Sequence, residues 1–170
     1  MRLYLFRHAD AVPRGTPGYA RDAQRPLTRE GHLQARQVAQ GLKRLKVAPG
    51  LILTSPYVRA VQTAEEARAV FGSRVAVKTL DALRAEANPQ ETSLALRGVG
   101  RHQALILVGH EPHISAWLGG LVAGSGGLRC LFKKAGVACV EVEHAPPPAG
   151  SGTLRWLMTP KQLALIGKGS

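Results

Sequence analysis

The chain has 170 residues, of which 45% are hydrophobic and 20% are charged. These proportions are typical of a globular protein, so we exclude global disorder and expect a single domain over residues 1–170. No apolar run approaches the roughly 18 residues that a membrane-spanning helix needs, so we expect no membrane partner. Arg7 interrupts the first apolar segment too early for a signal peptide, which predicts a cytoplasmic protein.

The formal net charge is +12, which favours anionic partners. The basic residues are scattered along the chain, whereas nucleic-acid binding needs a basic patch with groove-reading elements or stacking aromatics. Aromatic residues make up only 5% of the chain, so we expect a phosphorylated small molecule or protein as partner and no nucleic acid. Cys130 and Cys139 lack the spacing of a zinc site, and we expect two free thiols and no metal.

The predicted elements alternate between short apolar runs and longer helical patterns. Thr28 is the predicted N-cap of the first helix, and Ser55 and Pro56 are the predicted N-cap and first helical residue of the second. In chain order we predict a strand at 2–6, a long loop at 9–26, a helix at 28–45, a strand at 51–54, a helix at 55–71, a strand at 75–78, a helix at 88–98, a strand at 104–108, a turn at 109–112 that leads into a helix through Val122, a hairpin of 137–142 and 153–158, and a short helix from Pro160.

This alternation predicts an α/β fold, a three-layer α/β/α sandwich with a mostly parallel central sheet. Ala104–Val108 is a continuous apolar run, as expected of a central strand covered on both faces. Ligands of such sheets bind beyond the carboxyl ends of the strands. Arg7-His8, Ser55–Arg59 and His110 each follow a predicted strand, so we expect them to converge on one crevice.

Two arginines and two histidines in one crevice suit a phosphoryl group. Each guanidinium of Arg7 and Arg59 can contact phosphate oxygens with two N–H groups and stabilise the charge of the transferring group. A neutral imidazole of His8 can attack phosphorus and form a covalent intermediate, while His110 donates hydrogen bonds to the oxygens. The adjacent arginines disfavour an imidazolium at His8. This chemistry needs no metal and no other cofactor.

These segments resemble three motifs of one family, the histidine phosphatase superfamily with its phosphoglycerate mutase-like fold. Leu5–Asp10 (LFRHAD) resembles the Arg-His-Gly signature, Ser55–Ala64 (SPYVRAVQTA) is similar to the second arginine motif, and Val108–Glu111 (VGHE) to the second histidine motif. Their order and spacing also fit, and the resemblance extends over nearly the whole chain. The chain departs from the signature at Ala9, where glycine is usual, and alanine fits the turn only at a negative φ.

The resemblance implies that His8 becomes a phosphohistidine and that Arg7, Arg59 and His110 line the phosphate pocket. The backbone amide of Glu111 is a further candidate donor. The short chain is similar to bacterial phosphohistidine phosphatases, because it has little room for the insertions that cap the site in mutases and acid phosphatases. An open site admits a protein-borne phosphohistidine.

The proton donor and the role of the long loop stay open. Glu86 lies where the family commonly carries a general acid, but phosphohistidine needs such an acid less than an ester does, and Glu86 is otherwise a surface residue. Asp10 is a weaker alternative. Arg25 either closes over the phosphate or is simply solvated, and we expect His113 at the surface or behind the site.

Three functions compete. The first is a phosphatase acting on phosphohistidine or on a small phosphoester. The second is a mutase, which must shield its phosphoenzyme from water, and the short chain argues against it. The third is a basic anion- or nucleic-acid-binding protein. Binding of DNA or RNA that depends steeply on salt and survives the loss of His8 would favour this function. The sequence makes no prediction of oligomeric state.

Overall fold

The computed structural model describes residues 1–99 and 102–169. The described chain contains one six-stranded sheet with the strand order β3-β2-β4-β1-β5-β6. The strands are β1 (Arg2–Arg7), β2 (Leu51–Thr54), β3 (Ala76–Thr79), β4 (Ala104–Gly109), β5 (Val137–Glu141) and β6 (Thr153–Met158), and the α-helices are α1 (Arg29–Arg44), α2 (Val58–Phe71), α3 (Pro89–Ala95), α4 (His113–Ala123) and α5 (Pro160–Lys168).

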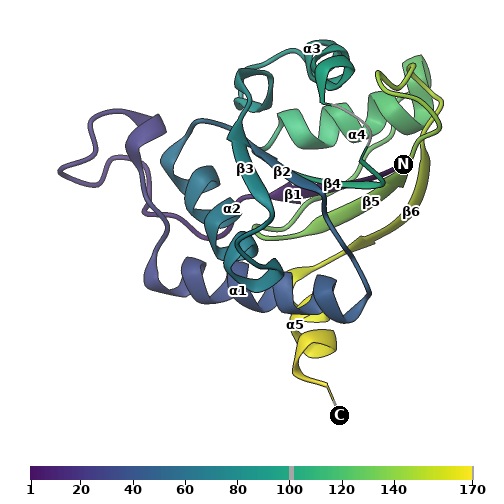
Figure 1. The fold of residues 1–170 in the computed structure, drawn as a ribbon. Helices are drawn as coiled ribbons and strands as arrows, with labels where there is room; N and C mark the ends of the chain where they lie inside the picture. Colours follow the sequence, from purple (N-terminus) through teal and green to yellow (C-terminus); the bar gives the residue numbers. More distant parts are fainter. Residues whose placement is uncertain (100–101, 170) are drawn as a thin grey trace.

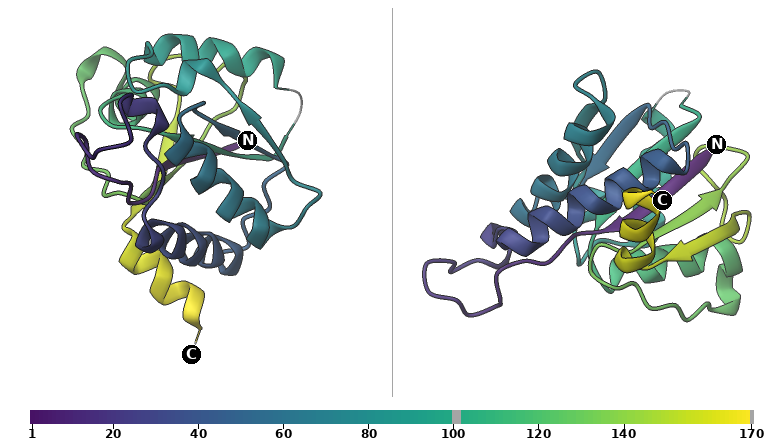
Figure 2. Two further views of the ribbon diagram at one scale, coloured as in Figure 1. Left: turned by 90° about the vertical axis from the view of Figure 1, so that its left-hand side faces the viewer. Right: turned by 90° about the horizontal axis from the view of Figure 1, so that it is seen from below.

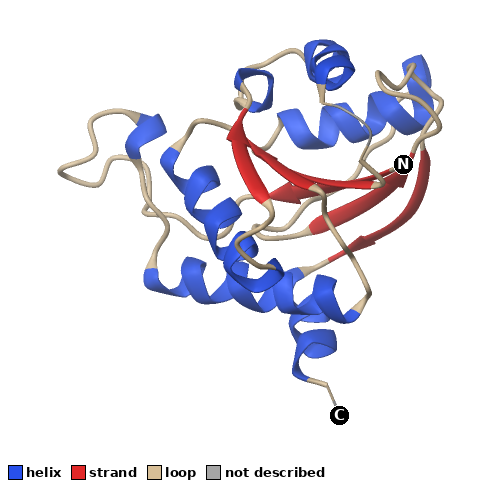
Figure 3. Ribbon diagram, viewed as in Figure 1, coloured by secondary structure: helices blue, strands red, loops and turns tan. Residues whose placement is uncertain are grey.

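Helices cover both faces of the sheet. In Figure 1, α1, α2 and α5 lie on one face and α3 and α4 on the other, and Figure 3 shows the sheet between these two layers. Strands β1 to β4 pair in parallel, whereas the β1–β5 and β5–β6 pairs are antiparallel. This arrangement confirms the predicted α/β/α sandwich with a mostly parallel sheet.

Each face of the sheet has its own hydrophobic core. Because side chains alternate along a strand, Tyr4 and Phe6 of β1 enter the core under α1 and α2, while Leu3 and Leu5 enter the core under α4. All six residues of β4 are buried, as expected for a strand with helices on both sides. The first helix begins where predicted, because the Thr28 hydroxyl accepts a hydrogen bond from the Gly31 amide at 2.9 Å.

Three of the predicted boundaries differ from those in the structure. Helix α2 starts at Val58 and not at Ser55, because the Ser55 backbone still belongs to the end of β2, where its amide donates to the Val108 carbonyl at 3.0 Å. Helix α4 starts at His113, directly after the predicted turn, and β4 continues one residue further than predicted, through Gly109. The helix predicted over 88–98 ends at Ala95 and continues as a 3₁₀ turn.

The register of the sheet brings three strand ends together. Arg7 pairs with Gly109, and Thr54 pairs with Val108, so β1, β4 and β2 end side by side. The loop between β1 and α1, which includes the 3₁₀ turn Asp22–Gln24, projects from the body beside these ends (Figures 1 and 2). Within residues 1–99 and 102–169, no helix has the length and apolar character to cross a membrane.

Candidate active site

The predicted phosphate-binding side chains meet at the carboxyl ends of β1, β2 and β4. His8 follows β1, His110 follows β4, and Arg59 lies in the first turn of α2, which follows β2. The ring centroids of His8 and His110 are 5.0 Å apart. The Nε of Arg59 lies 3.2 Å from Nε2 of His8. The structure therefore brings Arg7, His8, Arg59 and His110 into one cluster, as the strand order requires.

The hydrogen bonds of His8 define which ring nitrogen carries the proton. Nδ1 lies 2.7 Å from the Ala9 carbonyl oxygen, which can only accept, so Nδ1 is the protonated nitrogen. Nε2 then carries the lone pair and accepts the N–H of Arg59. Burial, followed by the charges of Arg59, Arg7 and Arg25, lowers the pKa of His8 from 6.5 to about 3. His8 is thus neutral, and Nε2 carries its lone pair.

Ala9 fits the turn where glycine is usual. The backbone φ of Ala9 is not positive, so its Cβ causes no backbone strain. The side chain is completely buried, and the amide donates to the Thr63 hydroxyl at 3.1 Å. This contact ties the turn after β1 to helix α2.

His110 and Arg7 each present a buried nitrogen with no partner among the described residues. The Nε2 of His110 lies 2.8 Å from the Ser55 hydroxyl, while its Nδ1 is unpaired. Burial, followed by the proximity of His8 and Arg59, lowers the pKa of His110 to about 2. Arg7 donates from Nη1 to the Phe132 carbonyl at 2.6 Å, and its Nε is unpaired. Unpaired buried donors are costly unless a ligand satisfies them.

Arg59 is held by a residue that the sequence analysis missed. Its guanidinium donates to the backbone oxygen of Asp22 at 2.7 Å and to Oδ2 of the same residue at 2.8 Å, although the Arg59 side chain is only 2% exposed. The second carboxylate oxygen of Asp22 accepts from Arg25 at 2.7 Å and from Arg14 at 2.9 Å. Burial opposes ionisation, but the hydrogen bonds from Arg25 and Arg59 lower the pKa of Asp22 to about 2.

Asp22 thus links three arginines through one carboxylate. A sequence signal existed, because Asp22 is the one acidic residue between Pro13 and Thr28, a stretch that also carries three arginines. Arg25, whose role was open, lies in the wall of the site and not in bulk solvent, with a side chain 11% exposed. It also donates to the Val12 carbonyl.

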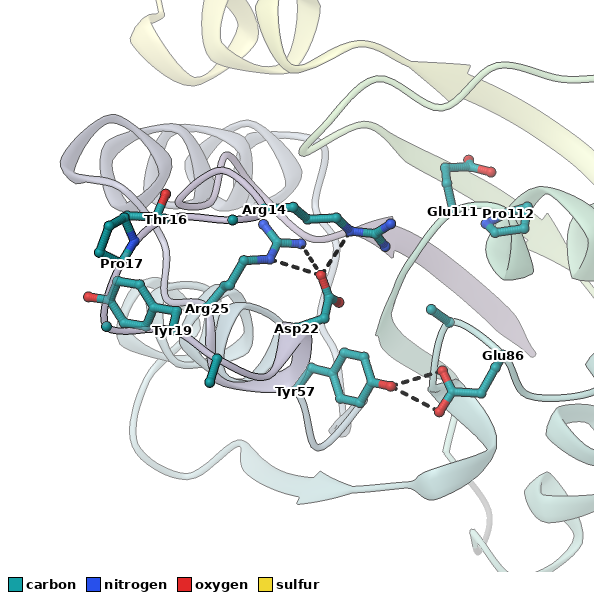
Figure 4. Close-up of a pocket in the computed structure, with 14 residues that line it drawn as sticks. Arg14, Thr16, Pro17, Tyr19, Asp22, Arg25, Tyr57, Glu86, Glu111 and Pro112 are labelled. Atoms are coloured by element: carbon teal, nitrogen blue, oxygen red, sulfur yellow. Dashed lines mark hydrogen bonds and ion pairs between the residues drawn. The ribbon is translucent and has the colours of Figure 1, made fainter.

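A cleft of about 900 Å³ opens above the cluster, and Figure 4 shows the residues that line it. A smaller chamber of about 210 Å³ contains Arg7, His8, Arg59 and His110. Four residues line both spaces, so the chamber forms the floor of the cleft. These four are Arg14, Arg25, Ala85 and Glu111.

Glu86 lies in the outer cleft and not in the floor chamber. The hydroxyl of Tyr57 donates to its carboxylate and lies 2.9 Å from each of the two oxygens (Figure 4). The Tyr57 ring lies 4.9 Å from that of His110, centroid to centroid. Sequence analysis missed this tyrosine, which it treated only as part of the motif that contains Arg59.

The other acidic candidates have partners of their own. Glu111 lies two residues before the start of α4 and lines both spaces. Its carboxylate accepts a hydrogen bond from the Ser115 hydroxyl at 2.7 Å. Asp10 accepts from Lys134 at 2.6 Å and from Thr28 at 2.9 Å. Burial alone would raise the pKa of Asp10, but these two hydrogen bonds outweigh it and lower the pKa.

His113 is buried behind the site, not at the surface. It is 2% exposed, and its Nε2 lies 2.9 Å from the Thr92 hydroxyl of α3. Burial lowers its pKa to about 4. In the part of the chain that the structure describes, no three His, Cys, Asp or Glu side chains are grouped so that they could hold a metal ion.

Comparisons with known proteins agree with this geometry. Residues 3–88 match the family model described as the histidine phosphatase superfamily (branch 1). An uncharacterised protein of Picosynechococcus sp. (strain ATCC 27264 / PCC 7002 / PR-6) is 38% identical over 165 residues, which cover 96% of this chain and 99% of that protein. The phosphohistidine phosphatase SixA of Escherichia coli K12 is 27% identical over 167 residues, 97% of this chain and 98% of that protein.

Among solved structures, that of the protein histidine phosphatase SixA complexed with tungstate superposes with a TM-score of 0.82 and 27% identity, covering 96% of this chain and 99% of that one. The fold is therefore phosphoglycerate mutase-like, as the resemblance implied, and the relatives support phosphatase activity. The motifs, the cluster at the strand ends and these comparisons lead to one conclusion: the chain belongs to the histidine phosphatase superfamily (branch 1).

Proposed function

We propose that the chain is a cytoplasmic, metal-independent phosphatase that transfers a phosphoryl group to Nε2 of His8 and then to water. In the first step the Nε2 lone pair forms an N–P bond, and the bond between phosphorus and the leaving group breaks with its electron pair on the leaving group. In the second step a water oxygen attacks phosphorus, and the electron pair of the N–P bond returns to Nε2.

The observation that carries this proposal is the protonation pattern of His8. The bond from Nδ1 to the Ala9 carbonyl leaves Nε2 as the free base, and burial beside three arginines keeps the ring neutral. Phosphorylation at Nε2 makes the ring cationic, and the Ala9 carbonyl then accepts a stronger hydrogen bond from Nδ1. The same contact thus orients the nucleophile and stabilises the intermediate.

The unpaired donors of the floor chamber supply the oxyanion site. Nε of Arg7 and Nδ1 of His110 lack protein partners and can donate to the phosphoryl oxygens. We assign the Ser55 hydroxyl as the donor to Nε2 of His110, which fixes the ring and places its proton on Nδ1. The SixA structure complexed with tungstate, a tetrahedral oxyanion, supports such a site. Arg59, Arg25 and the backbone amide of Glu111 are the further proposed ligands.

We infer that the substrate is a phosphohistidine carried on a protein. The cleft of about 900 Å³ opens to solvent, which admits a side chain projecting from a protein surface. The name of the 27% identical relative, a phosphohistidine phosphatase, supports the same class. For a small phosphoester, the other candidate substrate, Glu86 would be the proton donor to the leaving oxygen. An open cleft does not favour a mutase, whose phosphoenzyme must be kept from water.

The test measures phosphate release from para-nitrophenyl phosphate and from a phosphohistidine peptide, with and without EDTA. Wild type is compared with His8→Ala and with His144→Ala, a control whose side chain is 77% exposed. We expect EDTA-resistant turnover that falls by about 10³-fold or more in His8→Ala and is retained in the control. Unchanged turnover in a folded His8→Ala protein, or loss of activity with EDTA, would contradict the proposal.

A further inference from the structure

We propose that Tyr57 is a positioning residue that holds Glu86 as an ionised acceptor for an N–H group of the leaving group. The outer cleft would then select a protonated imidazole over an alcohol. This inference rests on the proposed function, since it concerns the leaving group of the same transfer. It assigns Glu86 a role other than proton donor to an ester.

The first argument is the symmetry of the contact between the two residues. The Tyr57 hydroxyl lies 2.9 Å from Oε1 and 2.9 Å from Oε2 of Glu86. An ionised carboxylate has two equivalent acceptor oxygens with about four lone-pair sites, whereas a protonated carboxyl has one oxygen that carries a hydrogen. Equal distances therefore match the ionised form. Burial and the hydrogen bond to Glu86 raise the pKa of Tyr57, so the phenol keeps the proton that it donates.

The second argument is that Tyr57 is itself fixed by the catalytic cluster. Its ring packs against that of His110, and the Arg59 guanidinium lies over the ring at 5.1 Å from the centroid. Tyr57 is also the N-cap residue of α2, two residues before Arg59. Its hydroxyl is thus held at a set place relative to the floor chamber, and Glu86 is held with it.

The third argument concerns direction. Nε2 of His8 attacks from the floor chamber, and in-line transfer sends the leaving group to the opposite side of phosphorus. Glu86 lines the outer cleft, which continues from the floor chamber past Ala85. The leaving group therefore departs into the space where the Glu86 carboxylate lies. Two further carboxylates line this space, but Asp22 is bound by arginines and Glu111 by Ser115.

The chemistry differs between the two kinds of leaving group. A phosphohistidine ring that carries a proton on its second nitrogen can donate that N–H to Glu86. When the P–N bond breaks, the electron pair stays on the ring nitrogen and neutral imidazole leaves, so no proton needs to be transferred. The oxygen of an alkyl or phenyl ester leaves as an anion unless it receives a proton, which an ionised Glu86 cannot supply.

The test measures kcat/KM of the Tyr57→Phe and Glu86→Gln variants on substrates that differ in their leaving group. The substrates are a phosphohistidine peptide, para-nitrophenyl phosphate with its good leaving group, and phenyl phosphate with its poor one. The matched control is Glu91→Gln, an exposed carboxylate on α3. We expect both variants to lose about tenfold or more in kcat/KM on the peptide, the effect of one hydrogen bond to a charged group. The loss on each phosphate ester should be several-fold smaller than the loss on the peptide.

Two results would overturn the inference. A loss concentrated on phenyl phosphate would make Glu86 the proton donor to an ester oxygen. An equal loss on all three substrates would make Tyr57 and Glu86 structural parts of the pocket. The proposed function is tested separately, because it requires turnover that depends on His8, whereas this inference concerns only the ratio between substrates. Circular dichroism of each variant establishes that it is folded.

Discussion

Replacing Asp22 with asparagine should weaken the fold and strengthen the binding of phosphate. Asparagine keeps the shape of the side chain but removes the charge that binds Arg59, Arg25 and Arg14. In the folded protein the pKa of Asp22 is lowered from 3.8 to about 2. A carboxylate with a lowered pKa stabilises the fold above pH 3.8, and this contribution is lost as the pH falls toward 2. The variant should therefore be studied near pH 7.

The size of both effects follows from the contacts. A pKa shift of this size corresponds to roughly 2.5 kcal/mol. Because the Asp22 side chain is 34% exposed, solvent screening reduces this to about 1 kcal/mol. The effect on phosphate affinity has the opposite sign, because Asp22 accepts the hydrogen bonds of the Arg59 guanidinium that a phosphoryl group would otherwise accept. Releasing one charged contact should tighten phosphate binding about tenfold.

Urea unfolding and the inhibition constant of inorganic phosphate measure the two effects. Asp81→Asn is the matched control, because Asp81 also pairs with an arginine, at 2.9 Å, but its side chain is 75% exposed. The control should change stability by less than about 0.5 kcal/mol and leave phosphate inhibition unchanged. Weaker phosphate binding in Asp22→Asn would refute the reasoning, because Asp22 would then be organising the arginines for the ligand and not competing with it.

Two further predictions concern the histidines. The pKa values of His8, His110 and His113 are lowered from 6.5 to about 3, 2 and 4. Below pH 6.5 the unfolded chain therefore binds protons that the folded chain does not. The free energy of unfolding should fall by about 2 kcal/mol per histidine at pH 5. Equal free energies of urea unfolding at pH 7.5 and pH 5 would contradict this prediction. Ser55→Ala should lower kcat about tenfold with little change in KM, because His110 loses the partner that fixes its proton. Unaltered steady-state kinetics would show that the His110 ring needs no such partner.

The fold and the floor of the site were readable from the sequence because both depend on local pattern. Apolar runs that alternate with helical patterns predict a parallel sheet, and Arg7-His8 and His110 directly follow two of these runs. Once the strands are neighbours, the positions of these residues at the site follow. The N-cap Thr28 was predicted correctly for the same reason, since a cap acts within three residues.

The remaining parts depend on contacts between distant segments. Ser55 was predicted to cap a helix, but its hydroxyl also contacts His110, 55 residues away. His113 was expected at the surface or behind the site, and it is buried behind the site because Thr92 of α3 supplies a hydroxyl for its ring. Asp22 reaches Arg59 across 37 residues. Local periodicity contains no information on which of several charged or polar residues will meet in space.

The site is divided between parts of the chain with different freedom to vary. The floor chamber depends on residues at the ends of β1, β2 and β4, where a change disturbs both hydrophobic cores. The wall of the outer cleft comes mainly from the loop before α1 and the turn before α3, at the periphery of the fold. Insertions or replacements in these two segments can redirect the enzyme to another phosphorylated compound while the proposed reaction at His8 is inherited unchanged, so substrate preference can diverge among descendants much faster than the chemistry.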